Sequence, residues 1–162
     1  GIENKPAFRS AWRKGNKCLV PVLGYYEWRQ QEAGKQPYFI TSTSINSAGK
    51  PGSESASGNV PAEPLVLAGL WEEAHIDGAA VQSCTIITTE SRGQLQSLHH
   101  RMPVMLDPGA ARQWLELSAP GKELLLEQNR VALGQPLQVY AVDRRVNRSS
   151  EEGEELVRPL DA

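Results

Sequence analysis

The sequence predicts an α+β protein built mainly on an antiparallel, strongly twisted, open barrel-like sheet with a few peripheral helices. Short runs of apolar, β-branched and aromatic residues follow one another along the chain, and polar turns separate them. Strands that are neighbours in sequence and joined by turns favour antiparallel pairing. Helix signals stand near the start of the chain and again after residue 106.

The first expected element is a helix over Pro6–Lys14. Proline suits a first helical turn, Phe8 and Trp12 fall four apart on one face, and Gly15 ends the helix. Strands are then expected at 17–23, 25–30, 36–41, 65–71, 81–89, 102–106 and 138–142. The turn at 32–35 makes a hairpin of its two flanking strands, and the residues from 72 to 80 are expected to form a polar turn.

Helix signals return in the second half of the chain. Residues 93–98 are expected to form one helical turn, and Asp107 caps a longer helix in which Pro108 takes the first position. The inward face of this helix is expected to hold Ala111, Trp114 and Leu115. Another helix is expected over 120–129, and the chain from 143 to 162 is expected to be polar and irregular.

The 162 residues fit one domain that can bury a core. A Ser-, Gly-, Pro- and Asn-rich run at 43–63 is expected to be a surface loop or a disordered insertion. The net charge is −2, whereas nucleic-acid-binding proteins usually carry a basic excess. The start of the chain is nevertheless basic and its end acidic, so a local cationic groove and ordinary solvated charge both stay open.

Cys18 and Cys84 lie in apolar strand-like runs and are expected to be small buried residues. Their spacing to each other and to the histidines does not match a metal site, so no metal is implied. No glycine-rich phosphate loop is present, and no cofactor is expected. No apolar run approaches the roughly 18 residues of a membrane span, and the start lacks the shape of a signal peptide. We therefore expect a soluble cytoplasmic protein without a membrane partner.

One carboxylate, Glu27, stands inside the aromatic run of residues 24–28. A carboxyl group held among Tyr25, Tyr26 and Trp28 would have a raised pKa and could act as a general acid or base. Strand alternation allows the opposite arrangement, with Glu27 on a solvated face and Tyr26 and Trp28 in the core. A second segment, residues 98–103, supplies an imidazole and a guanidinium far along the chain.

Several ordered blocks resemble one known family. They are Pro6–Trp12, Cys18–Pro21, Gly24–Trp28, Val66–Trp71, Ile86–Thr89, His99–Val104, Gln138–Tyr140 and Val146–Asn147. In this order they are similar to the blocks of the SOS-response-associated peptidase (SRAP) domain. The resemblance covers essentially the whole chain, which is more specific than any single motif.

The resemblance implies a sensor of abasic sites in single-stranded DNA that crosslinks itself to them and has an associated self-processing, peptidase-like activity. The family's nucleophile is an N-terminal cysteine, whose amine forms an imine with the sugar aldehyde and whose thiol then closes a thiazolidine. By resemblance, Glu27 would shuttle protons and His99 would orient or protonate the deoxyribose oxygen. Thr88 would line the pocket, and Arg101 would hold backbone phosphate. Such a protein would be nucleoid-associated in a bacterium or nuclear in a eukaryote.

The chain departs from the family at its start. It begins at Gly1, in a place that resembles the middle of the family's domain, without the N-terminal cysteine. Cys18 and Cys84 cannot replace that cysteine, because both are internal and lack a free α-amine. Either the chain is part of a longer protein or it is a natural short relative, and the first explanation is favoured. The chain alone is then expected to be inactive, and the missing N-terminal segment becomes an expected partner.

Two other functions compete with the abasic-site sensor. One is a single-stranded DNA-binding module without chemistry, using the basic start of the chain and Arg101 on phosphates. The other is an unrelated Glu/His hydrolase, for which the chain offers no G-x-S-x-G nucleophile motif. Salt dependence of binding would separate these two.

Overall fold

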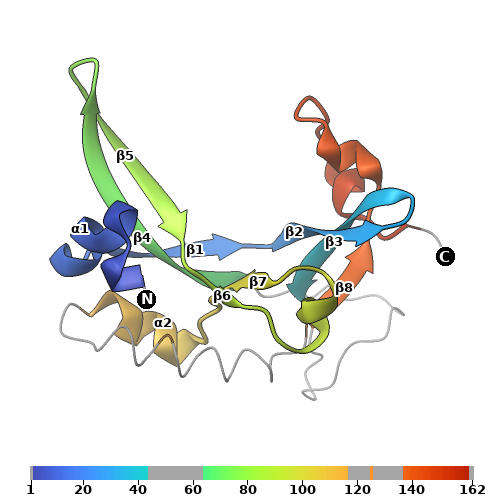
Figure 1. The fold of residues 1–162 in the computed structure, drawn as a ribbon, viewed down its shortest axis with the longest axis horizontal. Helices are drawn as coiled ribbons and strands as arrows, with labels where there is room; N and C mark the ends of the chain where they lie inside the picture. Colours follow the sequence, from blue (N-terminus) through green and yellow to red (C-terminus); the bar gives the residue numbers. More distant parts are fainter. Residues whose placement is uncertain (1, 44–63, 117–124, 126–136, 161–162) are drawn as a thin grey trace, which may run out of the picture. The chain divides into compact units, whose positions relative to one another are not determined.

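The computed structural model describes residues 2–43, 64–116, 125 and 137–160. Its elements, in chain order, are η1 (Ile2–Asn4), α1 (Pro6–Lys14), β1 (Lys17–Val22), β2 (Gly24–Gln31), β3 (Gly34–Ser42), β4 (Leu65–Ile76), β5 (Ala79–Ile86), β6 (Thr88–Glu90), η2 (Gly93–Ser97), β7 (Arg101–Pro103), α2 (Pro108–Leu115), β8 (Leu137–Ala141), η3 (Arg144–Asn147) and η4 (Glu154–Val157), where η marks a 3₁₀-helix (Figure 1). The α+β class is confirmed. The pairs β2–β3, β3–β8 and β4–β5 are antiparallel, and the strands divide over three sheets with the orders β1-β4-β5, β2-β3-β8 and β6-β7.

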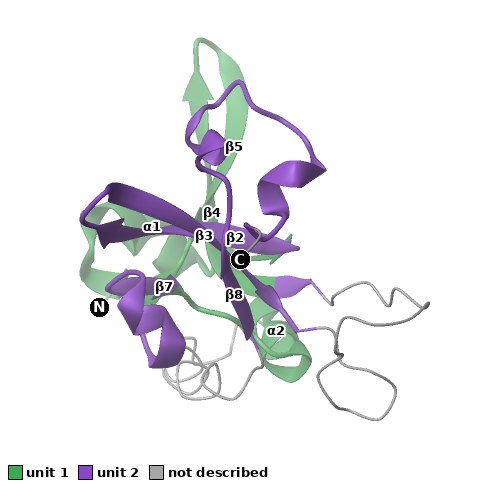
Figure 2. Ribbon diagram, turned by 90° about the vertical axis from the view of Figure 1, so that its right-hand side faces the viewer, with its two compact units in different colours: residues 1–21, 66–89, 103–134 green, residues 22–65, 90–102, 135–162 purple. Residues whose placement is uncertain are grey.

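The chain forms two compact units, coloured separately in Figure 2. Unit 1 consists of residues 1–21, 66–89 and 103–134, and unit 2 of residues 22–65, 90–102 and 135–162. The chain passes between the units several times, so neither unit is one continuous stretch of sequence. That both units belong to a single domain over 1–162 stays a prediction.

The core of unit 1 lies between α1, α2 and the sheet β1-β4-β5. Its centre is Trp114 on α2, which is 0% exposed and packs with Ala11 of α1 and with Ala68 and Leu70 of β4. The Trp114 indole donates a hydrogen bond of 3.0 Å to the carbonyl of Cys18, so it also ties α2 to β1. The Lys17 ammonium lies 5.0 Å from the centre of the same ring.

The helix ends follow the sequence signals. Gly15 takes a left-handed conformation with φ 69° after α1, and its N–H reaches the last carbonyls of the helix. The Asp107 side chain accepts the N–H of Ala110 at 2.9 Å and caps α2, as predicted. The expected inward face of α2 is correct for Ala111 and Trp114 but wrong for Leu115, which is 50% exposed. Leu115 is the last helical residue, where the helix face no longer meets the core.

The predicted polar turn at 72–80 is wrong. β4 continues to Ile76, and its residues from Gly69 onward pair with the whole of β5, from Gly69 opposite Ile86 to Ile76 opposite Ala79. The turn is only Asp77-Gly78, and both residues have positive φ, 52° and 82°, as a two-residue hairpin turn of type I′ requires. In the part of the β4–β5 hairpin nearest the turn, both faces are largely exposed. The residues there lack the apolar alternation that normally reveals a strand.

Unit 2 is built on the sheet β2-β3-β8. β2 and β3 form the predicted hairpin, in which Glu27 is opposite Tyr38 and Trp28 is opposite Pro37. One aromatic ladder crosses this sheet, with ring-centre distances of 6.4 Å from Trp28 to Tyr26, 5.2 Å from Tyr26 to Phe39 and 5.9 Å from Phe39 to Tyr140. Such tilted ring pairs stabilise the sheet beyond their buried area.

Other expectations need smaller corrections. β1 ends at Val22 and leaves Leu23 73% exposed, and Cys84, predicted to be buried, is exposed. The expected strand 102–106 is shorter, because only Arg101–Pro103 forms β7, and Met105 makes an isolated bridge to Leu67. The insertion expected at 43–63 and the helix expected at 120–129 lie almost entirely outside the described residues. Among the helices that the structure describes, none has the length and apolar character to span a bilayer.

Candidate functional site

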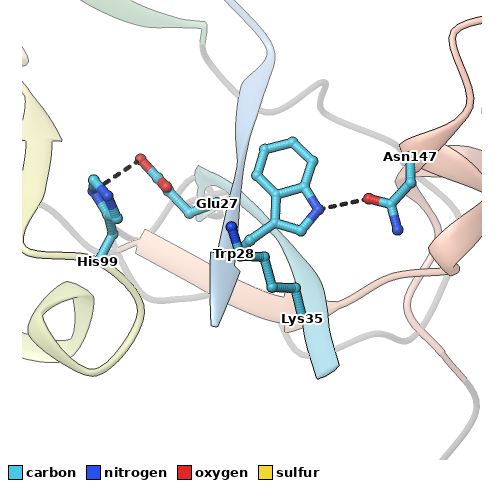
Figure 3. A pocket seen from close by; sticks show the side chains of 5 residues that line it. All are labelled: Glu27, Trp28, Lys35, His99 and Asn147. Atoms are coloured by element: carbon cyan, nitrogen blue, oxygen red, sulfur yellow. Dashed lines mark hydrogen bonds and ion pairs between the residues drawn. The ribbon is translucent and has the colours of Figure 1, made fainter. Parts of the chain in front are cut away.

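A pocket of about 410 Å³ in unit 2 brings together two of the side chains predicted to act in the site. Figure 3 shows its lining residues, which are Glu27, Trp28, Lys35, His99 and Asn147. Glu27 and His99 point toward one another on one side, and Trp28 points toward Asn147 on the other. All of these residues belong to unit 2.

Strand alternation places the pocket around β2. Tyr25 and Glu27 lie on one face of the strand, and Tyr26 and Trp28 lie on the other. Since β2 comes first in the order β2-β3-β8, nothing within that described sheet pairs with its outer side. His99 follows η2 in sequence, and its backbone N–H is bonded to the Leu95 carbonyl at 3.2 Å.

The carboxyl group of Glu27 is neither fully buried nor solvated. Its side chain is 23% exposed, and its Oε1 lies 3.9 Å from Nδ1 of His99. Burial raises the pKa of Glu27 above its ordinary value, while the two histidines His99 and His100 and a hydrogen bond from the backbone of Trp28 act in the opposite direction. A raised pKa keeps more of the acid form near neutral pH, which a proton donor requires.

The His99 ring is held through Nδ1. This atom lies 3.1 Å from the carbonyl oxygen of Arg101 and 3.2 Å from the backbone nitrogen of the same residue. A protonated Nδ1 can donate to the carbonyl, and an unprotonated Nδ1 can accept from the N–H, so the ring has a partner in either state. Its Nε2 is then the nitrogen that can act on a ligand.

Tyr25 is the second titratable group of the Glu27 face. Burial, and then the nearby Glu27 carboxylate, raise the pKa of its phenol, so the phenol stays protonated at physiological pH. Its hydroxyl oxygen is buried without a hydrogen-bond partner among the described residues. An unionised, poorly solvated neighbour leaves the Glu27 carboxyl in apolar surroundings, in line with its raised pKa.

The other two predicted site residues, Arg101 and Thr88, are not among the residues that line this pocket. Arg101 begins β7 in unit 2 and holds the His99 ring through its backbone. Thr88 begins β6, is exposed and belongs to unit 1. His100 is exposed, and its ring contacts that of His99 in a tilted arrangement with ring centres 4.3 Å apart. In the part of the chain that the structure describes, no three His, Cys, Asp or Glu side chains gather as metal ligands would.

The sequence did not single out Lys35 and Asn147 as site residues, and it named Trp28 only as a neighbour of Glu27 or as a core residue. Lys35 reaches the pocket because the hairpin register sets it opposite Gln30, close to Trp28. Asn147 ends a 3₁₀-helix in a segment expected to be irregular. The hairpin register would have revealed Lys35, whereas Asn147 stood in one of the blocks of family resemblance, Val146–Asn147, without a role assigned to it.

The raised pKa of Glu27 predicts a pH dependence of stability. The pKa of the Glu27 carboxyl group is higher in the folded state than in the unfolded state, where it is near 4.5. The contribution of this group to folding stability is therefore complete below the unfolded-state pKa and is lost as the pH rises through the folded-state pKa. We therefore expect Glu27→Gln to gain stability relative to the unmodified protein as the pH rises through this window, and the difference to be constant above it. Urea unfolding at a series of pH values from about 4 to 8 measures this, with the exposed Glu32→Gln as the control. A difference of the opposite sign would contradict a raised pKa.

The sequence of this chain is similar to those of known proteins. A family model described as SOS response associated peptidase (SRAP) matches residues 1–149. The abasic site processing protein HMCES of Xenopus tropicalis is 33% identical over 129 residues, which cover 76% of this chain and 38% of that protein. The abasic site processing protein YedK of Escherichia coli is 26% identical over 154 residues, which cover 94% of this chain and 61% of that protein.

Two solved structures share the fold. A crystal structure of a protein from Bacteroides thetaiotaomicron aligns with a TM-score of 0.71 at 24% identity and covers 98% of this chain and 62% of that one. Another, from Bordetella bronchiseptica, aligns with a TM-score of 0.62 at 25% identity and covers 88% of this chain and 62% of that one. The chain thus spans less than two thirds of each of these relatives. Since the family model covers most of its residues, the chain belongs to the SOS response associated peptidase (SRAP) family.

Proposed function

We propose that this chain carries the acid–base part of an abasic-site processing protein that acts on single-stranded DNA and crosslinks to it. The observation that carries the proposal is the meeting of Glu27 and His99, far apart in sequence, at 3.9 Å in one pocket. Curated relatives with sequence similarity to this chain are named abasic site processing proteins. Because the chain spans only part of them, the activity is proposed for the natural protein that carries these residues.

The chemistry assigned to the pocket is proton transfer around a sugar aldehyde. An abasic deoxyribose opens to an aldehyde, an amine adds to it, and the resulting carbinolamine loses water to give an imine. Glu27 in its acid form would give the proton to the departing hydroxyl and recover one from the attacking amine. Nε2 of His99 would protonate or orient the ring oxygen as the sugar opens. The amine, and the thiol that would close a thiazolidine, would come from an N-terminal cysteine outside these 162 residues.

The proposal is tested by incubating the natural protein with an abasic and an intact single-stranded oligonucleotide of the same sequence. We expect a covalent adduct with the abasic strand alone, stable without reductant. For the 162-residue chain alone we expect no such adduct, because Gly1 offers an amine but no thiol. Equal binding of both strands without any adduct would instead support a DNA-binding module without chemistry. Cleavage of the abasic strand, and release of an N-terminal peptide, would test the lyase and peptidase-like activities.

Lys35 provides a test of DNA contact at this pocket. Its ammonium group lies at the pocket lining beside Trp28, where it could meet a backbone phosphate. Lys35→Gln is expected to weaken binding of single-stranded DNA and to reduce the slope of log affinity against log salt by about 0.7, the value for one lost phosphate contact. The matched control is Lys14→Gln on the exposed end of α1. An equal loss in both variants would mean that binding follows general basic charge and not this pocket.

A further inference from the structure

The segment after β8 takes part in the candidate site. Three polar tips of the aromatic ladder are hydrogen-bonded to it. The Tyr26 hydroxyl donates to the Leu156 carbonyl at 3.2 Å, the Tyr140 hydroxyl to the Val157 carbonyl at 2.9 Å, and the Trp28 indole to the Asn147 side chain at 2.7 Å. Only the last of these bonds is made to a side chain, and only its two partners line the pocket.

Asn147 is itself held in place by the hairpin that carries Trp28. η3 begins two residues after Val142, whose N–H donates to the Pro37 carbonyl at 3.1 Å, and Pro37 is the residue opposite Trp28 in the hairpin. The buried Gln36 donates to the Val142 carbonyl at 2.8 Å. The acceptor at Asn147 is thereby fixed relative to the strand pair on which Trp28 lies.

Further contacts hold η3 in the same place. The Arg144 guanidinium donates to the Gln36 side chain at 3.3 Å and to the Ala33 carbonyl at 3.4 Å, so it reaches the hairpin turn. Asp143 caps η3 by accepting the Arg145 N–H at 2.8 Å. These bonds fix where Asn147 emerges at the end of η3.

An indole ring on a partly exposed strand face has a second χ angle that packing alone fixes weakly. In this pocket Tyr26 contacts one side of Trp28, with ring centres 6.4 Å apart, and Asn147 holds the indole N–H. With both in place, the ring lines the pocket on the side of β2 opposite the Glu27–His99 pair, as Figure 3 shows.

We propose that Asn147 is a positioning residue, which fixes the Trp28 indole as one wall of the pocket through the Trp28 Nε1–H to Asn147 Oδ1 hydrogen bond. Asn147 takes no part in proton transfer. Its effect on turnover rests on the proposed abasic-site function, whereas its effect on the ring does not. A fixed ring limits the positions that a DNA strand can take in the pocket, which raises the share of encounters in which its sugar reaches Glu27 and His99.

The test compares Asn147→Leu, which keeps the size but removes the acceptor, with Asn147→Asp, which keeps an acceptor oxygen. The indole N–H signal of Trp28 is assigned in ¹H–¹⁵N spectra from its loss in Trp28→Phe. We expect Asn147→Leu to shift this signal and speed its exchange with water, and Asn147→Asp to leave it protected. Adduct formation is measured at saturating abasic DNA, where a change in affinity does not affect the rate. Asn147→Leu is expected to slow it by about two- to ten-fold, the range for the loss of one neutral hydrogen bond. Asn147→Asp is expected to keep most of the rate.

Asn4→Leu, at an exposed position of η1 in unit 1, is the control for a general effect of the substitution. Circular dichroism and urea unfolding show whether each variant is folded. An unchanged indole signal in a folded Asn147→Leu protein overturns the proposal, as does a freed indole with an unchanged rate. If the unmodified protein fails to react with abasic DNA, the proposed function fails, and the indole signal still decides whether Asn147 positions Trp28.

Discussion

Glu27→Gln is expected to slow adduct formation with abasic single-stranded DNA by about 10²- to 10⁴-fold, the range for loss of a general acid–base group. Glutamine keeps the size and the hydrogen-bonding oxygen of the side chain but can neither give nor take a proton. Glu27 is the proposed proton-transfer group of the pocket, because its side chain is partly buried and burial raises its pKa. Single-turnover rates in the natural protein, measured at saturating DNA, report this loss without a contribution from binding.

The matched control is Glu32→Gln, in the exposed turn between β2 and β3. It makes the same chemical change on the same hairpin outside the pocket, so its rate is expected to stay near that of the unmodified protein. A Glu27→Gln protein that reacts at the normal rate would remove Glu27 from the mechanism. A loss confined to DNA affinity would make it a binding residue only.

Trp114→Ala is expected to lower the free energy of unfolding by about 3–5 kcal/mol, as deletion of a large buried aromatic side chain usually does. Trp114 is 0% exposed at the centre of the unit 1 core. Its loss opens a cavity among α1, α2 and β4 and leaves the Cys18 carbonyl without its hydrogen bond. Denaturant unfolding followed by circular dichroism measures the change.

Two variants separate the parts of this effect. Trp114→Phe keeps most of the buried ring and removes the indole donor, so its loss should be smaller than that of Trp114→Ala. Trp71→Ala removes a tryptophan of β4 that is 36% exposed, and its cost should be clearly lower because less apolar area leaves the core. A Trp114→Ala protein as stable as Trp71→Ala would contradict the position of the core.

Local signals in the sequence predicted those parts of the fold that depend on local chemistry. Gly15 ends α1 and Asp107 caps α2 as expected, because both effects act within one helical turn. The hairpin β2–β3 was also predicted from a local signal, the turn between its two strands. The outer part of β4–β5 was missed because its pairing gives no one-sided burial pattern, although Asp77-Gly78 was a usable turn signal.

The candidate site was predictable only in part. Glu27 stood out because a carboxylate among aromatic residues is unusual, and the family resemblance pointed to His99. Their approach to 3.9 Å depends on how the segment after η2 lies against β2, which no spacing in the sequence encodes. The resemblance at Val146–Asn147 did not reveal the proposed role of Asn147 for the same reason, since that role depends on a hydrogen bond to a strand far away in sequence.

The most direct test of the central proposal is to locate the abasic sugar on the natural protein by NMR. The probe is a single-stranded oligonucleotide with a tetrahydrofuran abasic analogue, which binds without reacting, and the reference is the intact strand. We predict that the abasic analogue shifts the side-chain signals of Glu27 and His99 more than any others in unit 2, and that the intact strand does not. Shifts that are equal for both strands, or centred away from this pocket, would contradict the assignment of abasic-site processing to Glu27 and His99.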